Sequence, residues 1–212
     1  MDDINALIAG FKKFKREYEE DIQGKFRNLA EYGPHSKILM IACCDSRVDP
    51  AIITNSSAGD LMVVRNVANL VPPYDPHSSF KESQAAIEFA VCYLNIQHIV
   101  VMGHSRCAGI RSLLTRLLDM AEPVHSLDKW TVVAEPAARE VLAEIPESDL
   151  DEQACLCSRK ALALSLENLK SYPSVVDRLE KKALQLHGWY FNLASGDLER
   201  YLSTERRFES LF

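Results

Sequence analysis

Two short segments of this sequence carry side chains that could bind a metal ion. Cys43 is followed by Asp45 and Arg47, and His104 is followed by Cys107. Two thiolates and one imidazole make a Cys₂His set, and three protein ligands with an open fourth position are typical of a catalytic zinc site. A single cysteine is more often a small buried apolar residue. The prediction therefore depends on the two segments meeting in the fold.

Each segment follows an apolar run that predicts a buried strand. The runs are residues 38–43 and 98–102, and their length and composition are typical of strands covered on both faces. A long connection with a helical pattern joins them, which favours a parallel pair. Ligands bind at the carboxyl ends of such strands. We therefore expect Cys43 to lie close to His104 and Cys107.

Several segments resemble the β class of carbonic anhydrases, and the resemblance covers most of the chain in order. The segments are Cys43–Arg47, Val63–Asn69, Ala85–Val91, Gly103–Cys107 and Leu186–Tyr190. Together with the periodicity, this indicates an α/β fold with a central, mostly parallel β-sheet flanked by helices. A long N-terminal helical arm and a C-terminal β-hairpin are expected at the two ends.

The resemblance implies a carbonate dehydratase that reversibly hydrates carbon dioxide to bicarbonate and a proton. It implies one Zn²⁺ per chain, bound by Cys43, His104 and Cys107, with zinc-bound hydroxide as the nucleophile. Asp45 and Arg47 would form a catalytic dyad. Asp45 has two possible positions: it binds zinc as a fourth ligand, or it pairs with Arg47 and leaves the metal open.

The expected substrate wall departs from the family pattern. Pro34 stands where members commonly carry Gln, Met62 where many carry Phe, and Phe89 where some carry Tyr. Ala108, before Gly109, replaces the first glycine of the usual Cys-Gly-Gly. We take Met62, Phe89, Ala108 and Gly109 as substrate contacts and predict an active but attenuated enzyme.

Gln84 is a candidate for the hydrogen-bond donor that the wall lacks, because Pro34 has neither an amide side chain nor a backbone N–H. The general preference of Gln for the surface favours the alternative, a solvated Gln84. Met40 stands where the family's non-catalytic bicarbonate site uses Trp, so we do not expect that form of regulation.

The composition suits one domain over residues 1–212, because 47% of the chain is hydrophobic and such a length can bury a full core. The net charge is −6 and no basic patch is present, so nucleic acid is not an expected partner. The first residues carry acid where a signal peptide carries base, and the six cysteines suit reduced thiols. No apolar run is long enough to span a bilayer, so we expect a cytoplasmic protein.

Apolar residues recur at steps of three or four through residues 3–30, which predicts a helix within an arm at 1–33. The stripe is rich in aromatic side chains, as interfaces are, and in the family the N-terminal helices embrace the partner subunit. The resemblance thus favours a homodimer or a dimer-based tetramer. Further predicted elements are helices at 50–55, 78–94, 106–120, 128–144, 152–171 and 173–182, a buried strand at 61–65 and a hairpin at 183–202.

Two other functions fit the sequence. The substituted wall is compatible with a hydrolase of carbon disulfide or carbonyl sulfide on the same scaffold. A non-catalytic zinc- or bicarbonate-binding protein is the second, although a structural site would need neither Asp45 nor Arg47. Arg65 is equally compatible with a structural pair and with a substrate role, and His187 is expected in a structural hydrogen bond.

Overall fold

The computed structural model describes residues 3–18, 23–33, 36–77 and 79–211. The chain divides into two compact units, Met1–His35 and Ser36–Phe212. The first unit corresponds to the predicted arm at 1–33. The assignment of the whole chain to a single domain stays a prediction.

The first unit contains α1 (Asp3–Glu17) and α2 (Gln23–Tyr32). The sequence predicted one continuous helix, whereas residues 19–22 between the two lie outside the described part of the chain. Every residue of α1 is exposed. Its apolar side chains follow one helical face: Ile4, Leu7, Ile8, Phe11 and Phe14.

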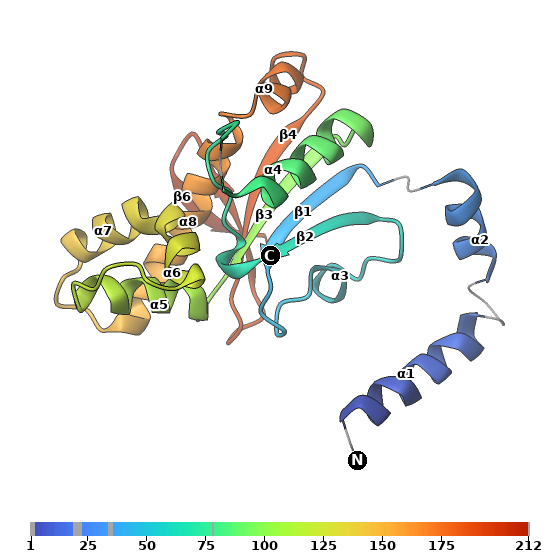
Figure 1. Ribbon diagram of the computed structural model, residues 1–212, viewed down its shortest axis with the longest axis horizontal. Helices are drawn as coiled ribbons and strands as arrows, with labels where there is room; N and C mark the ends of the chain where they lie inside the picture. The colour runs from blue at the N-terminus through green and yellow to red at the C-terminus, as the bar shows by residue number, and fades with distance from the viewer. Residues whose placement is uncertain (1–2, 19–22, 34–35, 78, 212) are drawn as a thin grey trace. The chain divides into compact units, whose positions relative to one another are not determined.

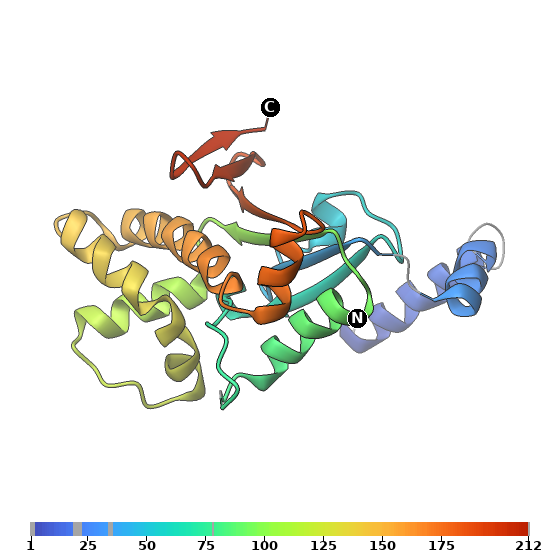
Figure 2. The same ribbon diagram turned by 90° about the horizontal axis from the view of Figure 1, so that it is seen from above.

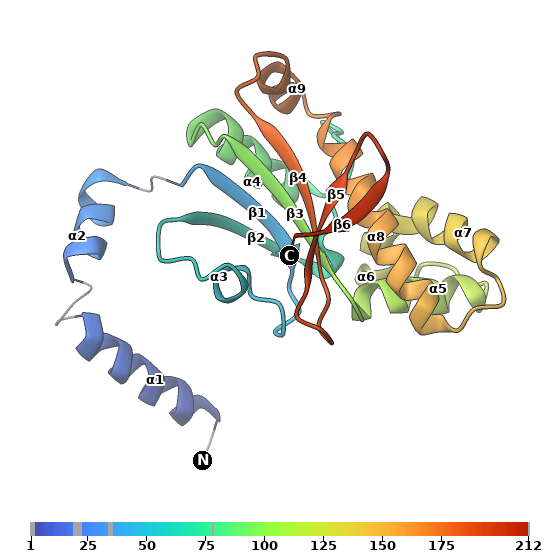
Figure 3. The same cartoon turned by 180° about the vertical axis from the view of Figure 1, so that it is seen from behind.

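The second unit is built on a six-stranded sheet of order β2-β1-β3-β4-β5-β6. The strands are β1 (Ile38–Cys43), β2 (Leu61–Asn66), β3 (His98–His104), β4 (Gln185–Phe191), β5 (Leu198–Leu202) and β6 (Arg207–Ser210). The strands β1 to β4 run parallel to one another. Strand β5 pairs antiparallel with β4, and β6 pairs antiparallel with β5 (Figures 1 and 3). This confirms the predicted fold class. The predicted hairpin is β4–β5, and β6 adds a strand that the sequence did not indicate.

The helices of this unit lie on both faces of the sheet and beyond its carboxyl ends. They are α3 (Pro50–Ile53), α4 (Lys81–Glu88), α5 (Ala108–Leu118), α6 (Ser126–Thr131), α7 (Glu135–Glu144), α8 (Leu150–Leu169) and α9 (Pro173–Glu180). Figure 2 shows α4, α8 and α9 on one face and α3 on the other. No helix among the described residues is long and apolar enough to cross a membrane.

Two predicted helices are interrupted. The helix predicted at 78–94 is α4 followed by a π-helical turn, Phe89–Tyr93. The helix predicted at 128–144 is α6, a 3₁₀ turn and α7. Pro136 explains the second break. Proline is favoured in the first turn of a helix, and inside a continuous helix it would lack the N–H needed for a backbone hydrogen bond.

The strands β1 and β3 are buried on both faces, as predicted. Leu39 and Ile99 pack in the cluster that includes α4, α8 and α9 side chains, and Met40 and Val100 pack on the opposite face. The prediction of a buried strand at 61–65 is wrong: β2 is only partly buried, with Val63 39% exposed. The reason is position, because β2 lies at the edge of the sheet.

A second apolar cluster lies beyond the carboxyl ends of β1 and β3, where α5, α6 and α7 gather (Figure 1). It contains Cys43 and Cys107 together with buried side chains of α5, α7 and α8. These helices surround the predicted metal ligands with packed apolar side chains, which limits the movement of the loops that carry them.

Close packing of β4 on α8 gives a test of the fold. A Cβ on Gly188 would lie 2.6 Å from Leu162 Cδ2 and 2.9 Å from Leu166 Cδ1. We expect Gly188→Ala to lower the free energy of unfolding, measured by urea denaturation, by about 1–3 kcal/mol, because overpacking a core costs that much. Gly10→Ala is the control, because its methyl group would meet nothing within 4 Å. Equal stability of the two variants would contradict this packing.

Candidate metal centre

Three buried donors converge at the carboxyl ends of β1 and β3. Cys43 ends β1, His104 ends β3, and Cys107 is the N-cap residue of α5. Their ligand atoms all lie within 4.8 Å of one another. The two sulfur atoms are 3.9 Å apart, and a tetrahedral ion with Zn–S bonds of about 2.3 Å would separate them by about 3.8 Å. The predicted Cys₂His cluster is therefore formed, with a spacing that fits zinc.

The imidazole of His104 is prepared for a metal. Its Nδ1 lies 2.8 Å from the carbonyl oxygen of Ser105, so Nδ1 carries the proton and donates. Its Nε2 is buried and has no hydrogen-bond partner among the described residues. An unpaired buried acceptor is costly, so Nε2 is expected to bind something. A metal-binding histidine usually donates its other ring N–H to a carbonyl or carboxylate, as Nδ1 does here. Together with the two sulfurs, this donor set fits zinc.

The thiols of Cys43 and Cys107 are hydrogen-bonded to each other, and either sulfur could donate. The hydrogen bond with Cys107 is the main cause that lowers the pKa of Cys43, with smaller contributions from His104 and backbone N–H groups, while burial opposes it. The same interaction and burial raise the pKa of Cys107. One proton thus leaves readily, and the second is held until a cation replaces it.

Asp45 is held by Arg47. Arg47 Nε donates to Oδ1 at 2.9 Å, and Arg47 Nη2 donates to Oδ2 at 2.6 Å. The backbone N–H of Arg47 adds a third bond to Oδ1 at 3.0 Å. These bonds lower the pKa of Asp45. Arg47 Nη2 also donates to the carbonyl of Arg106 at 3.2 Å, which joins the loop after β1 to the loop after β3.

Arg65 supports the loop that carries Cys43 and Asp45. Its Nε donates to the Cys43 carbonyl at 3.0 Å, and its Nη2 donates to the Asp45 carbonyl at 2.6 Å. Its Nη1 pairs with Asp49, which caps α3. Of the two roles open for Arg65, these contacts support the structural one. Sequence reasoning could not select it, because the partners are mainly backbone carbonyls.

The 3₁₀ turn Val67–Asn69, which the sequence did not reveal, contacts the Cys43 side chain. Ala68 has φ 64° and ψ 23°, and its N–H donates to the Cys43 sulfur at 3.3 Å. Gly109 packs against this turn, since a Cβ there would clash with Val67 Cγ1. This glycine, predicted as a substrate contact, is thus buried beside the metal-binding loop.

The other predicted wall residues lie on several elements. Met62 is partly buried on β2 and packs on the main core. Phe89 is 48% exposed and stacks on Tyr93 at 5.8 Å, and Ala108 is exposed at the start of α5. A substrate wall made of these residues stays a prediction.

Gln84 is buried on α4, with 8% exposure, so the favoured expectation of a solvated side chain is wrong. Its Oε1 has no hydrogen-bond partner within the described ranges. Helix α4 turns this position toward the interior, which general surface preference could not indicate. Pro34, the substitution that prompted the role proposed for Gln84, lies outside the described residues.

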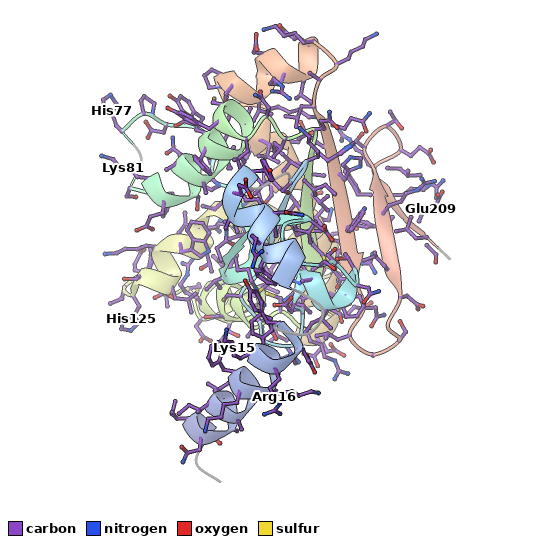
Figure 4. The ribbon with its side chains drawn as sticks, turned by 90° about the vertical axis from the view of Figure 1, so that its right-hand side faces the viewer. Lys15, Arg16, His77, Lys81, His125 and Glu209 are labelled. Carbon is purple, nitrogen blue, oxygen red and sulfur yellow. The ribbon has the colours of Figure 1, made fainter. Side chains whose placement is uncertain are left out.

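Within the described ranges, the other histidines behave as polar residues rather than metal ligands, and His35 lies outside those ranges. His98 Nδ1 lies 3.1 Å from His187 Nε2, which confirms the structural hydrogen bond expected for His187. His77 and His125 project outward from the surface (Figure 4).

Comparison with known sequences places the chain. The family described as carbonic anhydrase matches residues 38–198. Over 201 residues the chain is 37% identical to beta carbonic anhydrase 5, chloroplastic, of Arabidopsis thaliana, a match that covers 95% of this chain and 64% of that protein. This chain belongs to the carbonic anhydrase family. A carbonic anhydrase of Synechococcus elongatus is 35% identical over 195 residues, which cover 92% of this chain and 70% of the relative.

Solved β-carbonic anhydrases share the fold over nearly the whole chain. The structure of CcaA superposes with a TM-score of 0.90 at 33% identity and covers 98% of this chain and 99% of that one. CafA of Aspergillus fumigatus gives a TM-score of 0.83 at 29% identity, with 94% and 90% covered. These matches confirm two predictions at the level of the family. The first is the β class of carbonic anhydrases, and the second is a carbonate dehydratase, which is a lyase that binds zinc. The cytoplasmic location stays a prediction, and the Arabidopsis relative is chloroplastic by name.

The metal ligands can be separated from other buried cysteines. We expect Cys107→Ala to lose bound zinc, because it removes one of three donors and metal binding is coupled to folding. Cys157→Ala is the matched control, since Cys157 is also buried but lies on α8 and is not one of the three residues of the Cys₂His cluster. Zinc content is measured by atomic emission spectroscopy. Full zinc in Cys107→Ala would contradict the assignment.

Proposed function

We propose that this carbonic anhydrase interconverts carbon dioxide and bicarbonate with one zinc ion per chain, held by Cys43, His104 and Cys107. The observation that carries the proposal is the buried Cys₂His cluster, in which His104 Nε2 has no hydrogen-bond partner in the part of the chain that the structure describes. When bound, zinc supplies the Lewis acidity that generates a nucleophile from water near neutral pH.

The proposed role of the Asp45–Arg47 pair is to orient the nucleophile. Asp45 follows the ligand Cys43 by two positions, and Arg47 holds both of its carboxylate oxygens. Each carboxylate oxygen has two lone pairs, so Asp45 keeps acceptor capacity for a proton of the reacting water. Arg47 fixes the carboxylate in its charged form and draws it toward the guanidinium, which favours an open metal position.

The direct test is stopped-flow hydration of carbon dioxide by the zinc-loaded protein, with carbon disulfide and carbonyl sulfide assayed in parallel. We expect hydration that is lost on chelation and restored by zinc. A loaded protein that hydrates no faster than buffer, or that turns over only the sulfur compounds, would overturn the proposal.

The dyad predicts non-additive losses. Arg47→Ala and Asp45→Ala should each reduce hydration while zinc is retained, and the double variant should lose little more than the worse single variant, because the residues act as a unit. Arg200→Ala is the control, since it breaks an exposed pair with Glu209 on the outer strands. Losses that multiply in the double variant would show two independent residues.

The hydration rate should rise between about pH 6 and pH 9, since the water at a site with two thiolates is less acidic than the water at the three-histidine site, where bound water has a pKa of about 7. Asp45 does not cause this rise. Its pKa is lowered by Arg47, so the carboxylate is already charged throughout this range. Initial rates in buffers of constant ionic strength check this, and a flat profile would count against the thiolate explanation.

We also propose that the chain forms a homodimer or a dimer-based tetramer through the arm at 1–33. The support is the exposed apolar stripe of α1, where Leu7 is 71% and Phe11 is 63% exposed. Soluble proteins rarely leave such a contiguous patch uncovered. Two β-carbonic anhydrases of Sordaria macrospora, with TM-score 0.79 and 26% identity, are tetrameric by their description.

A charge placed in the stripe tests the assembly. Phe11→Glu should reduce the molar mass measured by light scattering after size-exclusion chromatography, because a carboxylate would be buried without a partner. Lys13→Glu changes an exposed charge on the same helix and should leave the mass unchanged. An unchanged mass in Phe11→Glu would contradict an interface on this face.

A further inference from the structure

The 3₁₀ turn Val67–Asn69 holds Ala68 in a conformation that alanine does not favour. Ala68 has φ 64° and Asn69 has φ 48°. Asparagine tolerates left-handed backbone, whereas for alanine it is disfavoured and persists only where the surroundings enforce it. The turn bears on the metal ligands, because the Ala68 N–H donates to the Cys43 sulfur. This N–H belongs to the same planar peptide group as the Val67 carbonyl.

A tryptophan from a distant helix fixes the turn. Trp130 Nε1, on α6, donates to the carbonyl of Val67 at 2.8 Å across 63 positions of sequence. Its ring meets Phe80 edge-on, with centroids 5.2 Å apart and planes at 84°. On the far side of the turn, the Asn66 side chain bonds both the N–H and the carbonyl of Leu70, each at 2.9 Å.

We infer that Trp130 is a positioning residue of the metal centre. By holding the Val67 carbonyl, its indole N–H keeps the turn left-handed and keeps the Ala68 N–H on the Cys43 sulfur. That hydrogen bond draws charge from the thiolate and makes it a weaker donor to a bound metal. Outer-shell partners of this kind change metal affinity by roughly 10–100-fold. The inference rests on the proposed function, because it takes the Cys43 sulfur to be a metal ligand.

Cobalt(II) gives the readout, since it adopts the geometry of zinc and has a thiolate-to-metal charge-transfer band. Trp130→Phe keeps an aromatic ring and removes the N–H. We expect its band at longer wavelength than in the wild-type protein, because the thiolate becomes a stronger donor. The matched control is Trp189→Phe, the only other tryptophan, which packs against the Met40 cluster and should leave the band unmoved.

A second substitution separates positioning from general packing. Ala68→Gly allows the left-handed conformation without steric cost, so in the Trp130→Phe background it should return the band toward its wild-type position. If Trp130→Phe does not fold, Phe80→Leu provides the test. It keeps the indole N–H but removes the ring that orients it, and a smaller shift in the same direction is expected.

The outcomes are distinguishable. A Trp130→Phe band at the wild-type position overturns the inference and leaves the proposed function intact, as does a shift that Ala68→Gly fails to reverse. For Phe80→Leu, an unmoved band has the same meaning. A wild-type protein that takes up no cobalt or zinc overturns the proposed function itself.

Discussion

The close approach of two buried thiols and an unpartnered imidazole nitrogen is the constraint on which the rest of the molecule depends. Cys43 and Cys107 have their sulfur atoms 3.9 Å apart, and His104 Nε2 has no partner within the described chain. Two thiolates cannot occupy such a site without compensation, because burial and mutual repulsion both disfavour the second charge. A divalent cation resolves both costs together, and the surrounding elements hold the three donors ready for it.

The parallel sheet provides the first level of that support. The strands β1 and β3 pair in register, so their ends deliver Cys43 and His104 to the same edge of the sheet. Helix α5 then begins directly after Cys107, which is its N-cap residue. Because both strands are covered on two faces, the donors rest on the most rigid part of the fold.

Side chains on loops provide the second level. Arg65 fixes two carbonyls of the loop after β1, and Arg47 joins that loop to the loop after β3. The turn at Ala68 supplies an N–H to Cys43 from a third direction. The candidate metal centre is thus surrounded by backbone groups whose positions are set by residues far apart in the sequence.

The sequence by itself determined the strands that carry the candidate metal ligands and those ligands, whereas it left two positions open for Asp45. Residue type and strand ends were sufficient there, because parallel strands in one sheet bring their carboxyl ends together whatever the remaining packing. Only the tertiary structure decided that β2 is an edge strand, that Gln84 is buried, and that Arg65 and Trp130 act through backbone carbonyls. Every residue carries a carbonyl and nearly every residue an N–H, so such contacts leave no mark on residue type or spacing. They arise only when the packed core brings together segments that lie tens of residues apart.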